Sequence, residues 1–237
     1  MGKGPETLPG GLRLDTEGGF PLSTDSMCLG AFCPLFPGDR VADLGSGCGT
    51  LGLLLLGRQR EITVAGIEQN GTAHEKALEN IRRGGLSDRM ESILGDLRQA
   101  AREFSPGGFD LVVSNPPYFV PGRGQSCPDP DRRAAREGNG CSPEELYAAA
   151  ARLLPTGGRF CLCGRTEALT ELLFWGRRLG LEPKRLQFIR HRASTPAKVL
   201  LLECRRGGRP GLKLEPDLIL YEENGAPTAQ TRRIYGL

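Results

Sequence analysis

The chain has 237 residues, of which 38% are hydrophobic and 25% charged, and its formal net charge is +3. This composition is typical of a soluble globular protein and excludes an intrinsically disordered chain. The longest apolar run, residues 51–56, is too short to cross a membrane, and the N-terminus lacks the apolar segment of a signal peptide. We therefore expect a cytoplasmic protein that does not contact a membrane.

Length and patterning favour one main domain at residues 38–206. An N-terminal arm with a short helix (1–37) precedes it, and a C-terminal tail (207–237) is expected to pack on the same domain. The charge is uneven. Residues 150–237 contain sixteen Lys/Arg and eight Asp/Glu, whereas residues 1–149 contain fifteen Lys/Arg and twenty Asp/Glu. A basic C-terminal half favours a polyanionic partner, although a solvated helix face would produce the same excess.

The eight cysteines show no Cys-x-x-Cys spacing. Cys161 and Cys163 alternate on a predicted strand, and Cys48 lies in a glycine-rich turn. We interpret the cysteines as small buried side chains in a reducing compartment, and predict neither a metal site nor a disulfide framework.

The first elements carry little periodic pattern. Residues 1–19 are poor in apolar side chains and predict a loose arm. A short helix is expected after residues 20–25, capped by Thr24 or Asp25 and ended by the proline- and glycine-containing residues 34–38.

A strand at Arg40–Leu44 runs directly into Gly45-Ser46-Gly47-Cys48-Gly49, and Thr50 opens a helix that continues through Leu56. This order is the first unit of a doubly wound α/β sheet, in which the glycines let a ligand approach the backbone closely. Thr50 stands where the dinucleotide fingerprint has its third glycine, which counts against a nicotinamide cofactor.

Each of the next three predicted strands ends in polar residues. Residues 62–67 end at Glu68, residues 90–94 end at Gly95 and Asp96, and residues 109–113 lead to Asn115. In an open α/β sheet the carboxyl ends of the strands meet at the edge where ligands bind. Glu68 is placed to hold both hydroxyls of a ribose, and Asp96 to accept from an adenine amine. The alternative for Glu68 is an ordinary surface carboxylate.

The loop Ser114-Asn115-Pro116-Pro117-Tyr118 contains the residue types that methylation of a poor amine nucleophile needs. The exocyclic nitrogen of adenine shares its lone pair with the ring and must become more tetrahedral to attack a methyl donor. Two fixed acceptors favour that geometry: the amide oxygen of Asn115 and the carbonyl of Pro116, which Pro117 holds extended. Tyr118 offers a ring for a flipped-out base. Taken alone, this loop also fits a plain turn beside a core tyrosine.

The loop 119–140 is long and rich in glycine, proline and charge, which favours a functional role. Its four arginines are interpreted as contacts to a phosphate backbone: Arg123, Arg132, Arg133 and Arg136. Helices are expected at 72–82, 142–154 and 166–179, the second opened by a capping box and a proline.

Three more strands, at 159–163, 186–189 and 199–202, bring the total to seven, the last two as a hairpin at the sheet edge. Between them lies His191, for which an exposed loop position is favoured over catalysis because no carboxylate is near in sequence.

Two motifs resemble those of a known group. Asp43-Leu44-Gly45-Ser46-Gly47-Cys48-Gly49 resembles the first motif of class I S-adenosylmethionine-dependent methyltransferases, and Asn115-Pro116-Pro117-Tyr118 resembles their amino-methylating motif. More narrowly, the chain is similar to bacterial tRNA(Val) adenine N6-methyltransferases over most of its length. The resemblance implies a Rossmann-like, doubly wound, seven-stranded, mostly parallel sheet with an antiparallel edge strand.

The resemblance further implies methyl transfer from S-adenosyl-L-methionine to N6 of an adenine in the anticodon loop of tRNA(Val), without a metal. The implied catalytic residues are Asn115, Pro116 and Tyr118. The implied cofactor-binding residues are Asp25, Asp43, Gly45, Gly47, Gly49, Glu68, Asp96 and Asn115. The implied substrate-binding residues are Pro117, Tyr118, Phe119, Arg132, Arg136, His191, Arg192 and Lys198. A monomer is expected, with a homodimer as the alternative.

Three other functions use similar residues. A glutamine N5-methyltransferase that acts on release factors uses the same loop, but fewer than 40 residues precede the first strand, where such enzymes carry a helical domain. A DNA adenine methyltransferase needs a target-recognition domain that the length does not accommodate. A non-catalytic nucleic-acid-binding module stays open, as does the choice of tRNA and adenine.

Overall fold

The computed structural model describes residues 5–16, 21–116 and 141–237. Its strands are β1 (Glu6–Thr7), β2 (Arg13–Leu14), β3 (Arg40–Leu44), β4 (Thr63–Glu68), β5 (Met90–Leu94), β6 (Leu111–Ser114), β7 (Arg159–Arg165), β8 (Leu181–Arg190), β9 (Val199–Arg206), β10 (Lys213–Leu214) and β11 (Leu218–Ile219). Its helices are α1 (Thr24–Phe32), α2 (Thr50–Arg58), α3 (Gly71–Arg83), α4 (Leu97–Glu103), α6 (Pro143–Leu153), α7 (Leu169–Arg178) and α8 (Ala229–Tyr235), with a 3-10 turn at Thr166–Ala168.

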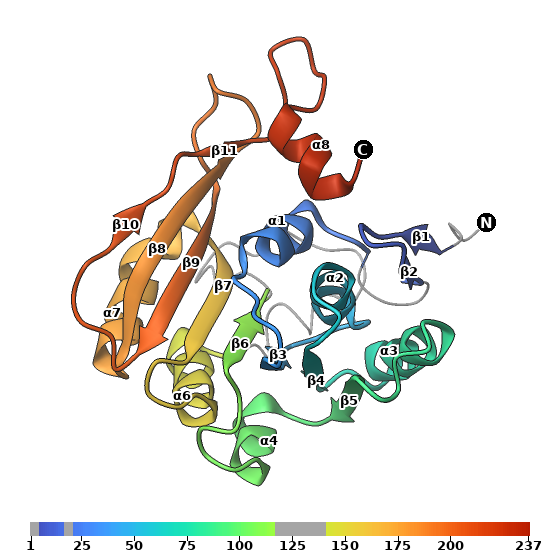
Figure 1. Ribbon diagram of the computed structural model, residues 1–237. Coiled ribbons are helices and arrows are strands. Elements are labelled where there is room, and N and C mark those ends of the chain that lie inside the picture. The colour runs from blue at the N-terminus through green and yellow to red at the C-terminus, as the bar shows by residue number, and fades with distance from the viewer. Residues whose placement is uncertain (1–4, 17–20, 117–140) are drawn as a thin grey trace, which may run out of the picture.

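The central sheet has nine strands among the described residues, in the order β10-β8-β9-β7-β6-β3-β4-β5, with β11 also paired to β8 (Figure 1). Strands β3 to β7 pair in parallel, and β9 runs antiparallel to both of its neighbours, β7 and β8. The predicted doubly wound, mostly parallel sheet is confirmed. All seven predicted strands are present, and two-residue strands β10 and β11 extend the sheet along β8.

Helices cover both faces of this sheet (Figure 1). Buried side chains of α1, α2 and α3 form one apolar cluster, and those of α4, α6 and α7 form the other. Helix α2 packs on β4 and beside α1, which itself contacts β7 and β9. The leucines of α2 at positions 51 and 53–56 are all buried. Gly30 lets α1 pack closely against α2, since a Cβ at this position would lie only 3.2 Å from the Cβ of Leu54.

The N-terminal arm is a docked hairpin, so the prediction of a loose arm is wrong for residues 5–16. Strands β1 and β2 pair antiparallel, and Leu8 and Leu14 are 2% and 0% exposed. The amide of Asn80, on α3, accepts from the backbone N–H of Asp15 and donates to its carbonyl, both at 2.9 Å. The hairpin is therefore fastened to the main domain by a buried side chain.

Helix α1 is capped by Ser23, whose Oγ accepts from the N–H of Ser26 at 3.1 Å; the prediction of Thr24 or Asp25 as the cap is wrong by one or two residues. The capping box at the start of α6 is confirmed. Two short helices, α4 and α8, were not predicted.

Candidate active site

The polar residues at the strand ends share one edge of the sheet. The registers of β4 and β6 against β3 place Gly45 between Glu68 and Asn115. The register of β5 against β4 places Asp96 on the far side of Glu68. Because neighbouring strands lie about 4.8 Å apart, the backbones at Glu68 and Asn115 are separated by about 10 Å. The structure thus brings together Asp96, Glu68, the loop Gly45–Gly49 and Asn115.

The glycine loop has a conformation that depends on glycine. Gly45, Gly47 and Gly49 have φ values of 77°, 56° and 82°, a region that other residues rarely adopt. The backbone N–H groups of Gly45 and Ser46 both donate to the carbonyl of Ile67, at 2.9 and 3.1 Å. A Cβ added at Gly45 would meet nothing within 4 Å, so this side of the loop is open.

Glu68 fixes the loop from the adjacent strand. Its side chain accepts two backbone hydrogen bonds, from Gly47 N–H at 2.8 Å and from Asn70 N–H at 2.7 Å, one on each carboxylate oxygen. Glu68 is 7% exposed. Each oxygen keeps a further lone pair, so the carboxylate has capacity for two more donors, as the hydroxyls of a ribose supply.

Asp43 lies directly before the glycine loop and is fully buried. Neither of its carboxylate oxygens has a hydrogen-bond partner among the described residues. Burial raises the pKa of Asp43 to about 7, the neighbouring Glu68 carboxylate adds to the rise, and the nearby backbone N–H of Gly52 opposes it. The structure therefore holds Asp43 as a buried group whose charge is costly.

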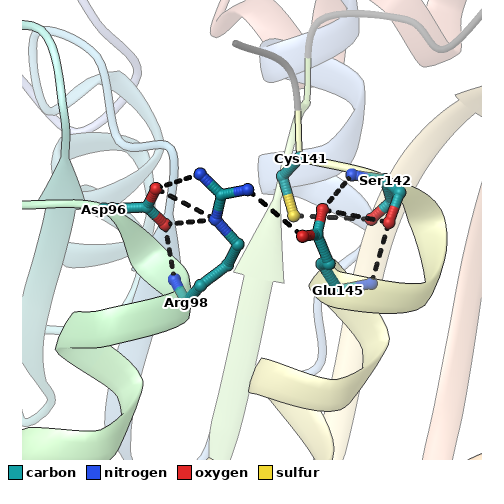
Figure 2. Close-up of polar contacts among 5 residues, drawn as sticks. All are labelled: Asp96, Arg98, Cys141, Ser142 and Glu145. Carbon is teal, nitrogen blue, oxygen red and sulfur yellow. Dashed lines mark hydrogen bonds and ion pairs between the residues drawn. The ribbon is translucent and has the colours of Figure 1, made fainter.

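Asp96 is already engaged by Arg98 (Figure 2). It caps α4 by accepting the backbone N–H of Arg98 at 2.8 Å, and both of its oxygens accept from the Arg98 guanidinium. Nη1 of Arg98 lies 3.1 Å from Oε1 of Glu145, which forms the capping box of α6 with Ser142. The hydrogen bonds from Arg98 lower the pKa of Asp96. An adenine amine at Asp96 would share its acceptor with this guanidinium.

Asn115 is held from two sides. The hydroxyl of Ser114 donates to the carbonyl of Leu44 at 2.7 Å, which ties the end of β6 to the end of β3. The side-chain Nδ2 of Asn115 donates to Oγ of Ser26 at 2.9 Å, in the first turn of α1, where Asp25 also lies. Pro116 follows and is buried.

Two residues of this site were missed by the sequence analysis. Ser26 contacts Asn115 from 89 residues away. Asn80, which binds the N-terminal hairpin, also donates to the carbonyl of Cys48 inside the glycine loop at 3.0 Å. Neither had a motif to mark it, because a buried serine or asparagine reveals its partner only in the folded chain.

The remaining substrate candidates lie further along the same edge or outside the described residues. His191, Arg192 and Lys198 belong to the connection between β8 and β9, which leaves the sheet at this edge because β8 runs parallel to β7. Three strand spacings, about 14 Å, separate β8 from β6. His191 and Lys198 are exposed, and the His191 ring lies 4.8 Å from the ring of Tyr221. The predictions for Pro117, Tyr118, Phe119, Arg132 and Arg136 lie outside the described residues, as do those for Arg123 and Arg133.

Part of the basic excess in residues 150–237 is engaged in ion pairs within the fold. Arg177 pairs with Glu182, Arg185 with Glu203, Arg190 with Asp217, and Lys213 with Glu215. The cations that remain for a polyanion are therefore fewer than the sequence count indicates.

The open glycine loop, Glu68 and Asp96 together fit the nucleoside part of S-adenosyl-L-methionine, since they present an uncovered backbone turn and two carboxylates at adjacent strand ends. Within residues 5–16, 21–116 and 141–237, no group of three or more His, Cys, Asp or Glu could hold a metal ion. Over the same residues no helix has the length and apolar character of a membrane span.

The relatives found by comparison with known proteins are methyltransferases. A family model described as "Methyltransferase small domain" matches residues 29–126. A tRNA1(Val) (adenine(37)-N6)-methyltransferase of Bacteroides fragilis is 32% identical, over 76% of this chain and 75% of the relative. The protein with the same name from Tolumonas auensis is 33% identical, over 85% of this chain and 82% of the relative.

Solved structures share the fold. A protein of Agrobacterium tumefaciens described as a predicted O-methyltransferase superposes with a TM-score of 0.72 at 22% identity, covering 90% of this chain and 96% of the other. M. capricolum TrmK in complex with S-adenosyl-homocysteine superposes with a TM-score of 0.55 at 14% identity, covering 82% and 71%.

Proposed function

Since this chain belongs to the tRNA1(Val) (adenine(37)-N6)-methyltransferase family of class I S-adenosylmethionine-dependent methyltransferases, we propose that it methylates N6 of adenine 37 in tRNA(Val). The observation that supports this most directly is the environment of Asn115. The strand register sets Asn115 beside Gly45 of the glycine loop, and the nitrogen end of its side-chain amide is held by a hydrogen bond to Ser26.

The cofactor would be held by residues at the strand ends. Glu68 would accept from the ribose hydroxyls, the loop Gly45–Gly49 would lie against the backbone of the ligand, and Asp96 would accept from its adenine amine. S-adenosyl-L-methionine supplies an electrophilic methyl group on a sulfonium when it is bound.

The target amine would be activated by two acceptors. Oδ1 of Asn115 and the carbonyl of Pro116 would each accept one N–H of the adenine N6 amine. Both acceptors favour the tetrahedral nitrogen whose lone pair is localised, so they stabilise the transition state more than the planar ground state. The N–C bond would form as the methyl–sulfur bond breaks, and the methylated nitrogen would then lose one proton to water. The two acceptor oxygens would only accept hydrogen bonds and would keep no proton.

tRNA would dock on the edge that carries the β8–β9 connection. Arg192 and Lys198 extend from this connection, and Arg232 and Arg233 extend from α8, which packs against α1 and β11 (Figure 1). Phosphate contacts from these cations would orient the anticodon loop toward Asn115. We propose a monomer as the working unit, and that the arm (1–37), the main domain (38–206) and the tail (207–237) act as one body.

The test is to incubate the purified protein with labelled S-adenosyl-L-methionine and separate pools of tRNA, DNA and peptide release factor. The expected product is N6-methyladenosine in tRNA, located at position 37 by mass spectrometry of nuclease fragments. The Asn115→Ala variant is the matched control and is expected to give almost no label. Label in a glutamine of the release factor would replace this proposal with a glutamine N5-methyltransferase.

A further inference from the structure

The amide of Asn115 can serve the proposed reaction in only one of its two orientations. A carbonyl turned to the target amine accepts a hydrogen bond, whereas an NH2 group turned to it would oppose one donor with another. Rotation of an asparagine amide by about 180° is a soft motion, because the terminal torsion has a broad, nearly two-fold profile. Some other group must therefore select the orientation.

Ser26 is the group that contacts the nitrogen end of this amide. Its Oγ accepts from Nδ2 of Asn115 at 2.9 Å. Ser26 is 8% exposed, so water competes little for this acceptor. Among the described residues no donor is bonded to Oδ1, the acceptor that the proposed reaction needs.

The hydrogen-bond chain behind Ser26 has a defined direction. The backbone N–H of Ser26 donates to Oγ of Ser23 at 3.1 Å, and the hydroxyl of Ser23 donates to Oγ of Ser26 at 3.0 Å. A backbone N–H can only donate, so Ser23 accepts there and has its own proton free for Ser26. Oγ of Ser26 thus accepts from Ser23 with one lone pair and from Nδ2 of Asn115 with the other.

The helix that carries Ser26 is fixed at both ends. Arg58, on α2, donates to the carbonyls of Gly30 and Cys33, the second at 3.0 Å, and so binds the C-terminal end of α1. The hydroxyl of Tyr235, on α8, donates to Oγ1 of Thr24 at 3.2 Å and holds the first turn. Met27, Cys28 and Leu29 are buried between these points.

We infer that Ser26 is a positioning residue for the proposed methyl transfer: by accepting from Nδ2 it keeps Oδ1 of Asn115 available to the amine. This inference rests on the proposed function, and it adds a residue of helix α1 to the two acceptors that activate the nucleophile. A serine that served only to build α1 would affect folding and leave turnover per folded molecule unchanged.

The kinetic test is a double-mutant cycle. Ser26→Ala is expected to lower kcat about tenfold, while KM for tRNA and the Kd of S-adenosyl-L-homocysteine change less than about twofold. In an Asn115→Ala background, Ser26→Ala is expected to have no further effect on kcat, because it acts through that amide. Ser26→Thr keeps the hydroxyl and is expected to restore most of the turnover.

A control on the same helix is Thr24→Ala, which removes the contact to Tyr235. Ser26 and Asn115 are expected to stay in place because the Ser23 cap and the contacts of Arg58 still hold α1. Thr24→Ala is expected to lower thermal stability with kcat unchanged. Wild-type kcat in Ser26→Ala, an equal loss in both backgrounds of the cycle, or a similar loss of kcat in Thr24→Ala would each overturn the inference.

An RNA-independent readout separates this inference from the proposed function. In NMR spectra the side-chain NH2 signals of Asn115, assigned by their loss in Asn115→Ala, are expected to exchange with water at least about tenfold faster in Ser26→Ala than in the wild type. Unchanged exchange overturns the role of Ser26 whatever the substrate is. If the wild-type protein labels no tRNA, the proposed function is refuted. The NMR comparison then still tests whether Ser26 holds the amide of Asn115.

Discussion

The buried carboxylate of Asp43 predicts that its removal stabilises the protein at neutral and alkaline pH. Asp43 is fully buried, and its oxygens have no hydrogen-bond partner among the described residues. The substitution Asp43→Asn keeps the shape of the side chain and removes its charge. We expect the variant to be more stable than the wild type at pH 8 and to lose that advantage on acidification.

The magnitude follows from the pKa. Burial raises the pKa of Asp43 from 3.8 to about 7, so the folded state binds this proton more tightly than the unfolded state. Stability is then lost as the pH rises from the unfolded pKa to the folded one, with no further loss above about 7. At about 1.4 kcal/mol per tenfold change in proton affinity, the full effect is at most about 4 kcal/mol. The buried amide of the variant costs about 1–3 kcal/mol, which leaves a net gain of about 1–3 kcal/mol at pH 8.

Urea denaturation of both proteins from pH 5.5 to pH 8.5 measures the effect. The difference in free energy of unfolding is expected to rise by about 2 kcal/mol between pH 5.5 and pH 7 and then level off. Asp88→Asn, at an exposed carboxylate, is the matched control and is expected to change stability by less than about 0.5 kcal/mol. A difference between Asp43→Asn and wild type that does not vary with pH would refute the argument that this carboxylate is buried without compensation.

Four further outcomes test the site. Asn115→Ala is expected to lower kcat by about 100-fold, since one fixed acceptor is lost, with little change in the Kd of S-adenosyl-L-homocysteine by calorimetry; equal activity removes Asn115 from the mechanism. Glu68→Gln places an NH2 against the N–H of Gly47 or Asn70 and is expected to weaken S-adenosyl-L-homocysteine binding at least about tenfold; unchanged affinity argues against Glu68 as the ribose ligand. Arg98→Met frees an acceptor on Asp96 and is expected to tighten the same ligand about three- to tenfold; no change would place Asp96 outside the cofactor site. Binding of bulk tRNA, followed by filter retention, is expected to weaken at least about tenfold between 50 and 200 mM salt; a salt-insensitive affinity rejects the basic residues as the docking surface.

Much of the fold was predictable because short apolar runs ending in polar residues are a strong local signal. β3 and β5 have the predicted bounds, and the rule that ligands gather at the carboxyl edge of an α/β sheet predicts that Glu68, Asp96 and Asn115 lie together. The capping box of α6 was likewise readable, since its residues lie within one turn of each other.

The missed elements are those whose residues carry no pattern of their own. β1 and β2 have two residues each, and α4 buries only Ala100 and Ala101, so periodicity was too weak to detect them. β8 begins at Leu181, five residues before its predicted start, and the added residues include Pro183, a residue type that is rare within strands. The structure accommodates this proline at a register shift between Pro183 and Arg185.

The contacts within the site were unpredictable for a different reason. Ser26 and Asn115 are 89 residues apart, and only the packing of α1 against the sheet brings their polar atoms together. Arg98 is close to Asp96 in sequence, but its bond to Glu145 depends on how α4 packs on α6. Long-range pairing of this kind has no sequence signature in a single chain.

Asn80 has a consequence for how the protein opens. Its one buried amide bonds both the hairpin at Asp15 and the glycine loop at Cys48, so detachment of either segment leaves part of that amide without a partner. We therefore expect opening of the two segments to be coupled in deuterium exchange. A ligand that stiffens the loop is then expected to slow exchange in the hairpin as well.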